Sequence, residues 1–228
     1  MAYQGRVGVA GNYDGKPFVG FVLASRSEPD RKLAVDKEKN RVWVAPGKDV
    51  TAKLEEGDFT AVDNLYACLI GFYDKGNKPT AVSFNGRMGN CVERMMRAGE
   101  PARLAMAQIL PVFVPQENDP RIGVVAHFYG ESGQPLFCWG VYDRADESST
   151  YLSVEETQIG ANKALYVPLT SCRDFGKLDL DIGSSLDELS QQLFEKILGA
   201  PPEFGCGAAV CMIDGNGFMF GVYNLRKE

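Results

Sequence analysis

A short segment near the N-terminus is the strongest candidate for chemistry in this chain. Residues 25–31, called here the arginine loop, read Ser-Arg-Ser-Glu-Pro-Asp-Arg, so Arg26 and Arg31 flank a proline-bent connection. The protein is acidic, with a formal net charge of −6, so binding of an anion requires a local concentration of positive charge. The planar guanidinium group of arginine binds phosphate or carboxylate through paired hydrogen bonds. The loop is therefore a candidate anion site, and the alternative is a solvated turn after a strand.

Further polar groups stand where apolar strands are expected to begin or end. Tyr66 opens an apolar strand, which would place its hydroxyl at a sheet end. Glu117 precedes another apolar strand, where partial burial suits a carboxylate to proton transfer. Asn85 lies between a strand and an expected helix, where it is a natural cap beside backbone N–H groups that attract anions. The structural alternatives are a core tyrosine, loop solvation and a helix cap.

The usual signatures of nucleophilic, nucleotide-binding and metal chemistry are absent from the sequence. It contains no G-x-S-x-G, G-x-G-x-x-G or Walker pattern. The single histidine, His127, lies in an apolar strand and is interpreted as structural, because a zinc site would need cysteine partners in place. Cys91 and Cys172 have no evident base, and removal of Met1 would expose only Ala2. We therefore expect no metal and no N-terminal nucleophile.

Length, charge and cysteine usage restrict the classes to which this protein can belong. The 228 residues suffice for one domain, 1–228, with a sizeable buried core. The negative net charge argues against a nucleic-acid partner, because proteins that coat nucleic acids are basic. No apolar stretch approaches the length of a membrane span, and we expect neither a signal peptide nor a membrane partner. The six cysteines show no C-x-x-C pairing, which favours reduced thiols and a cytoplasmic location.

The expected elements are typical of an α+β protein built on antiparallel hairpins. Gly, Asn or Asp stands at each expected turn, between apolar runs of strand length. The expected hairpins join residues 6–11 to 17–24, 66–73 to 79–84, 122–129 to 135–142 and 207–213 to 218–224, with short strands at 41–45 and 163–167.

Helices are expected over residues 89–97, 101–110 and 185–198. The last is the clearest, because Ser185 and Glu188 form a capping-box pattern ahead of an apolar face. Several strands are apolar on both faces, which indicates sheets covered on both sides in stacked layers. The polar residues 143–149 are interpreted as a surface loop rather than a domain boundary.

In their order along the chain, these segments resemble the archaeal-type IMP cyclohydrolase family. The ordered resemblance runs from residue 3 to about residue 130 and continues weakly through Glu-Glu-Thr at 155–157 and the final hairpin. The Ser-Arg-Ser-x-Pro-x-Arg piece is fairly specific. The matching pieces are Gly-Arg at 5–6, Gly-Lys-Pro-Phe-Val at 15–19, the arginine loop, Tyr-Ala-Cys at 66–68, Ser-Phe-Asn-Gly at 83–86 and Glu-Asn-Asp-Pro-Arg-Ile at 117–122.

The resemblance implies a four-layer αββα sandwich like that of the N-terminal-nucleophile hydrolases. It implies closure of the ring of 5-formamidoimidazole-4-carboxamide ribonucleotide to IMP in purine biosynthesis, with loss of water and without a cofactor. The activity belongs to the hydrolase class that acts on C–N bonds of cyclic amidines, and a homo-oligomer is expected. The catalytic residues implied are Arg31, Tyr66 and Glu117. The substrate-binding residues expected are Arg26, Ser27, Asn85, Gly86, Arg87 and Asn118.

The chain departs from the family pattern close to these residues. Glu28 stands where family members usually carry an aromatic side chain, and Ala67 stands where they have Asn. Arg87 and Met88 replace a small polar stretch, and the region 143–177 is expanded. The alternatives to an active cyclohydrolase are a nucleotide-binding homologue without turnover and a hydrolase of a related small amide.

Overall fold

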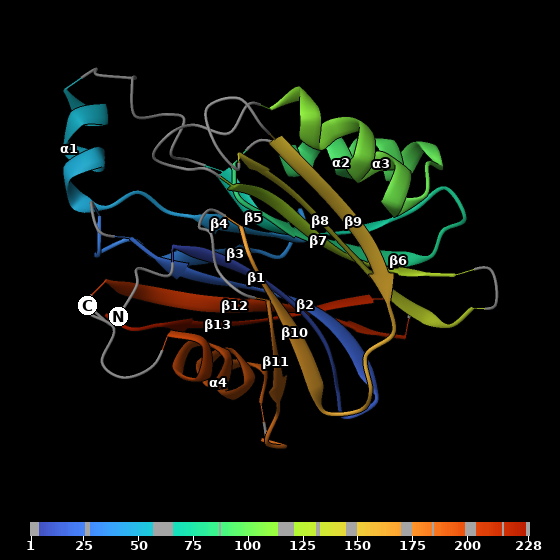
Figure 1. The fold of residues 1–228 in the computed structure, drawn as a ribbon. Helices are drawn as coiled ribbons and strands as arrows, with labels where there is room; N and C mark the ends of the chain where they lie inside the picture. The colour runs from blue at the N-terminus through green and yellow to red at the C-terminus, as the bar shows by residue number, and fades with distance from the viewer. Residues whose placement is uncertain are drawn as a thin grey trace.

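Two large antiparallel sheets face one another at the centre of the molecule (Figure 1). The computed structural model describes residues 5–25, 28–56, 66–86, 88–113, 121–130, 133–144, 150–169, 175–183, 185–198, 204–215 and 217–226. The six-stranded sheet has the order β11 (Gly176–Asp179), β10 (Lys163–Pro168), β1 (Arg6–Tyr13), β2 (Lys16–Ala24), β12 (Gly205–Asp214), β13 (Gly217–Asn224). The seven-stranded sheet has the order β3 (Leu33–Asp36), β4 (Arg41–Val44), β5 (Tyr66–Tyr73), β6 (Pro79–Phe84), β7 (Arg121–Tyr129), β8 (Pro135–Arg144), β9 (Thr150–Thr157).

Helices cover the outer faces of both sheets. α2 (Met88–Ala98), α3 (Ala102–Ile109) and the 3₁₀ helix η2 (Leu110–Val112) pack on the seven-stranded sheet, and α4 (Leu186–Leu198) packs on the six-stranded sheet (Figure 1). α1 (Lys48–Glu55) lies beside the end of the sheets that carries the arginine loop. No helix in the described part of the chain is both long and apolar enough to cross a membrane. The expected α+β class with antiparallel sheets covered by helices is confirmed.

The expected hairpins are all present, because local turn chemistry specifies them. Asp14 and Asn77 adopt positive φ angles of 49° and 58°, which Asn and Asp tolerate better than other side chains. The turns join β1 to β2 and β5 to β6 in antiparallel register. α4 likewise begins where the capping pattern predicts it, and Ser185 Oγ accepts a hydrogen bond of 3.1 Å from the Glu188 N–H.

Several elements were not expected from the sequence, namely β3, α1, β9 and β11. β3 and β11 are only four residues long, and α1 is largely polar, so none of these three elements presents a clear apolar period. The expanded region 143–177 supplies β9 to one sheet, and it supplies β10 and the first half of β11 to the other. The expectation of a surface loop over 143–149 is wrong for Asp143 and Arg144, which continue β8 and pair with β9, and residues 145–149 lie outside the described part.

A buried carboxylate fixes α2 against the seven-stranded sheet. Glu93 on α2 pairs with Arg41 on β4 at 3.2 Å and with Arg97 one turn along the helix at 2.9 Å. The Arg97 guanidinium also lies 4.9 Å from the centre of the Phe72 ring on β5. A buried carboxylate needs such partners to offset its lost hydration. These contacts tie the middle of α2 to β4.

A second contact joins the two sheets next to the arginine loop. The Asn224 side chain at the end of β13 accepts a 2.8 Å hydrogen bond from Leu33 N–H and donates one of 3.0 Å to Leu33 carbonyl oxygen. Leu33 opens β3 in the other sheet, two residues after Arg31. The exit from the arginine loop is therefore held by both sheets.

His127 on β7 is completely buried between the sheets, as its structural interpretation requires. Its ring contacts Tyr129 and Phe137 edge-on, with centroid separations of 5.0 and 5.4 Å. Neither ring nitrogen has a hydrogen-bond partner among the described residues. Burial therefore lowers the pKa of His127 to about 3, and the ring is neutral in the folded protein.

We expect this burial to make stability depend on pH. Since the folded protein binds the His127 proton more weakly than the unfolded chain, acid favours unfolding below the usual histidine pKa. His127 should lower the free energy of unfolding by about 2 kcal/mol between about pH 7.5 and pH 5. Urea denaturation of wild type and His127→Phe at both pH values measures this contribution. Equal pH slopes for the two proteins would contradict it.

Candidate active site

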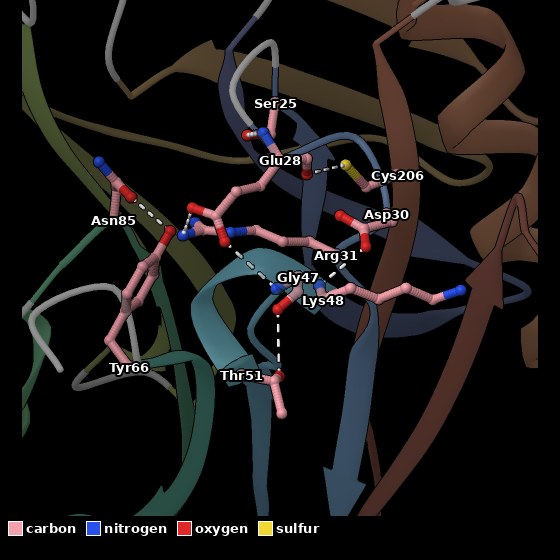
Figure 2. Close-up of polar contacts among 10 residues, drawn as sticks. All are labelled: Ser25, Glu28, Asp30, Arg31, Gly47, Lys48, Thr51, Tyr66, Asn85 and Cys206. Atoms are coloured by element: carbon pink, nitrogen blue, oxygen red, sulfur yellow. Dashed lines mark hydrogen bonds and ion pairs between the residues drawn. The ribbon is translucent and has the colours of Figure 1, made fainter. Parts of the chain in front are cut away.

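The candidate site lies at one end of the space between the sheets (Figure 2). The end of β2 and the start of β5 meet there, beside the segment that leaves β6. The arginine loop begins at Ser25 directly after β2, and Ser25, Glu28 and Arg31 are all buried. This burial rules out the solvated-turn alternative for these positions.

Arg31 is the central feature of the site. Its side chain is only 1% exposed, and its Nη2 donates to the Glu28 carboxylate. Its Nε and Nη1 atoms are buried and have no hydrogen-bond partner among the described residues. Buried polar groups almost always have a partner, because an unmade hydrogen bond costs about 1–3 kcal/mol. These two donor groups are therefore the candidate point of contact for a ligand oxygen.

The Glu28 carboxylate connects Arg31 to the start of α1. Its second oxygen accepts a hydrogen bond of 3.2 Å from the Gly47 N–H, and Asp30 accepts one of 2.8 Å from the Lys48 N–H (Figure 2). A Cβ atom on Gly47 would lie 2.5 Å from an Asp30 oxygen and 3.2 Å from a Glu28 oxygen. Glycine at position 47 therefore allows both carboxylates to approach the helix, where the dipole favours negative charge.

Tyr66 points into the space between the sheets because of a β-bulge. Ile70 and Phe72 face the helices, so strict alternation would place Tyr66 on that side as well. The register of β5 with β4 shifts between Val42 and Trp43, and after the shift Tyr66 packs in the core shared by the sheets. The bulge thus brings the phenol to the arginine loop.

The Tyr66 hydroxyl is a protonated donor. It donates a 2.5 Å hydrogen bond to Asn85 Oδ1 (Figure 2). Burial raises the pKa of Tyr66 to about 12, although the nearby charges of Arg6 and Arg31 act in the opposite direction. The hydroxyl therefore keeps its proton at neutral pH, under the influence of two guanidinium groups.

Asn85 does not cap α2. The helix begins at Met88, so Asn85 is not the residue directly before it, and its side-chain oxygen accepts the Tyr66 hydrogen bond instead. Gly86 follows with a φ of 82°, a conformation that suits glycine. Asn85 and Gly86 are both half-buried, and they line the candidate site beside Tyr66.

The described cysteines are free thiols and are poor nucleophiles where they are buried. Burial raises the pKa of Cys206 to about 11 and that of Cys138 to about 12, so both thiols stay protonated. Cys206 lies under the arginine loop, with its Sγ 3.7 Å from the Glu28 carbonyl oxygen. Cys91 is half-buried on α2, and Cys172 lies outside the described residues. No cluster of three or more metal-ligating side chains occurs within the described ranges.

The structure brings together Arg31, Tyr66, Asn85 and Gly86 from the expected set. Sequence reasoning missed Glu28 as the partner of Arg31 and Arg6 as a neighbour of Tyr66. The place of Glu28 three residues before Arg31, within the same loop, was the available signal. The expected residues outside the described part of the chain are Arg26, Ser27, Arg87, Glu117 and Asn118.

Together these groups form a candidate site of polar side chains, and its described residues include no exposed thiol. Arg31 offers unpaired donors to an oxygen atom, and Tyr66 offers a hydroxyl that remains protonated. Such preorganised donors stabilise charge that develops on an oxygen during addition to a carbonyl group.

Comparisons with known proteins identify the family of the chain. A family profile described as IMP cyclohydrolase-like protein matches residues 3–215. A protein named IMP cyclohydrolase from Methanocella arvoryzae is 26% identical to the chain over 226 residues, which cover 97% of this chain and 98% of that protein. Because the profile spans nearly all of the sequence, including every residue of the candidate site, the chain belongs to the family of IMP cyclohydrolase-like proteins.

Proposed function

We propose that this protein is an IMP cyclohydrolase, which closes the ring of 5-formamidoimidazole-4-carboxamide ribonucleotide to IMP with loss of water. The observation that carries the proposal is Arg31, a buried guanidinium with two nitrogen atoms lacking partners among the described residues. Membership of the family and the name of the relative from Methanocella arvoryzae support the choice of reaction. The reaction needs an oxyanion to be stabilised, which the unpaired donors of Arg31 suit.

The reaction forms one bond and removes one molecule of water. The carboxamide nitrogen attacks the formyl carbon, and the formyl oxygen becomes an oxyanion. This oxygen takes up two protons and leaves as water, while the carboxamide nitrogen and the formamido nitrogen each lose one. Because an amide is a poor nucleophile, holding the two groups in contact supplies much of the rate enhancement.

In the proposed mechanism each catalytic residue has one role. Glu117 takes the proton from the attacking nitrogen as general base. Arg31 stabilises the oxyanion with its free donors. Tyr66 donates a proton as the oxygen leaves, which its protonated state allows. Asn85 holds the Tyr66 hydroxyl in place, since the two side chains are hydrogen-bonded.

The remaining expected residues would hold the nucleotide. Arg26 and Arg87 are proposed to bind the 5′-phosphate together with backbone N–H groups that follow Asn85, because arginine and helix starts both favour phosphate. Ser27, Gly86 and Asn118 complete the proposed contacts with the substrate.

Finer features of the protein belong to the same proposal. The stacked sheets and outer helices are proposed to form an αββα sandwich related to the N-terminal-nucleophile hydrolases, with an internal site in place of a terminal nucleophile. The enzyme would act in purine biosynthesis as a homo-oligomer and without a cofactor. A homologue that binds nucleotide without turnover is the competing outcome of the tests below.

Replacement of Arg31 should remove the oxyanion stabilisation. We expect Arg31→Ala to lower kcat about 10²–10³-fold while the protein remains folded. Ultraviolet absorbance measures ring closure, and circular dichroism checks folding. Arg94→Ala, which removes an exposed arginine from α2, is the control and should keep full activity. A folded Arg31→Ala variant with a normal rate would remove Arg31 from the mechanism.

Replacement of Tyr66 tests the proton donor. Tyr66→Phe keeps the ring but removes the hydroxyl, and we expect kcat to fall about 10²-fold. Because the pKa of Tyr66 is raised to about 12, wild-type kcat should show no loss from its ionisation between about pH 8 and pH 10. Tyr151→Phe, at an exposed tyrosine on β9, is the control. An alkaline fall in this range that vanishes in Tyr66→Phe would contradict the assigned protonation state.

Glu117→Gln separates binding from chemistry. The amide keeps the size of the side chain but cannot accept the proton, so kcat should fall about 10²–10⁴-fold. Affinity for IMP, measured by calorimetry, should change little, because Glu117 acts on the attacking nitrogen. Glu38→Gln, at an exposed position, is the control. Unchanged kinetics would exclude Glu117 as the base.

A further inference from the structure

We propose that Glu28 is a positioning residue for Arg31, which fixes the direction in which the guanidinium presents its free donors to the reacting oxygen. This inference rests on the proposed cyclohydrolase function for its catalytic consequence. Its physical basis is a contact seen directly in the structure, the buried pair between the Glu28 carboxylate and Arg31 Nη2 (Figure 2).

Glu28 is held by contacts of its backbone and of its carboxylate. The backbone N–H donates to Ser25 Oγ at 3.2 Å, and the backbone carbonyl oxygen lies 3.7 Å from Cys206 Sγ. The second carboxylate oxygen accepts a hydrogen bond of 3.2 Å from Gly47 N–H. The side chain is 11% exposed. A carboxylate held at its backbone and at its tip is a fixed reference point for its partner.

The same contacts indicate that Glu28 acts through Arg31 rather than as a base. One carboxylate oxygen accepts from Arg31, and the other accepts from the start of α1. Neither oxygen is therefore free to take a proton from a substrate without losing a contact. The remaining Arg31 donors, Nε and Nη1, are the groups that stay without partners among the described residues.

The pair also changes the electrostatics of the site. The negative charge of Glu28 balances the positive charge of Arg31, so what Arg31 offers the reaction is directed N–H groups more than net charge. If the Glu28 carboxylate is removed, the guanidinium keeps its charge, which is then no longer neutralised, but it loses its orientation. Catalysis depends on orientation, whereas affinity for an anionic nucleotide follows charge. A variant should therefore lose rate without losing ligand affinity.

Glu28→Gln and Asp30→Asn form a matched pair for the test. Both replace a carboxylate of the arginine loop that accepts a hydrogen bond from the start of α1, but of the two only Glu28 pairs with the Arg31 guanidinium. We expect Glu28→Gln to lower kcat about 10–100-fold with no rise in the Kd for IMP measured by calorimetry. Asp30→Asn should leave kcat within about twofold of wild type. Glu28→Asp, which keeps the charge but shortens the reach, should also lower kcat.

A double-mutant cycle identifies the route of the effect. If Glu28 acts through Arg31, Glu28→Gln should cost nothing further in the Arg31→Ala background. An equal loss in both backgrounds, an equal loss in Asp30→Asn, or an unchanged kcat in Glu28→Gln would each overturn the proposal.

A ligand-free measurement keeps this test separate from the proposed function. In the wild-type protein the Arg31 guanidinium should give resolved, slowly exchanging ¹⁵N-detected NMR signals, because pairing with Glu28 restricts its rotation. In Glu28→Gln these signals should broaden or merge, whereas Asp30→Asn should preserve them. Identical Arg31 signals in wild type and Glu28→Gln would overturn the positioning role. Absence of ring closure by the wild type would overturn the proposed function and leave the NMR result to decide the role of Glu28.

Discussion

The buried ion pair between Arg31 and Glu28 is the interaction on which the rest of the site depends. Removing two charges from water is costly, and their attraction offsets that cost only when the remaining hydrogen-bonding groups are also satisfied. Glu28 meets this condition through Gly47, whereas Arg31 leaves two nitrogen atoms without partners among the described residues. The hydrogen-bond donors without partners therefore belong to Arg31, and such donors suit recognition of an oxygen atom.

The surrounding fold determines where this pair lies. Asn224 joins β13 to the start of β3, and Cys206 at the start of β12 packs beneath the arginine loop, so both sheets hold the loop. The bulge in β5 then turns Tyr66 toward the same end of the shared core. A site at the junction of two stacked sheets is shielded from water, and hydrogen bonds to developing charge are stronger there than in solvent.

Much of the fold was predictable because its signals are local. Turn residues with positive φ, such as Asp14 and Asn77, specify hairpins, and the Ser185 cap marks the start of α4. The elements that escaped prediction lack such signals. β3 is short, and α1 is polar and is held mainly at its start by contacts from residues 28 and 30. Propensity and periodicity do not record contacts of this kind.

The sequence by itself determined the hairpins, the main helices, the arginine loop as a candidate anion site and the family resemblance, because each depends on residues close together in the chain. Only the tertiary structure decided that Arg31 is buried against Glu28 and that Asn85 receives the Tyr66 hydrogen bond rather than capping α2. It also decided that Tyr66 faces the space between the sheets. The physical reason is that burial and strand register depend on segments far apart in the chain, and one shifted residue reverses the face on which a side chain lies.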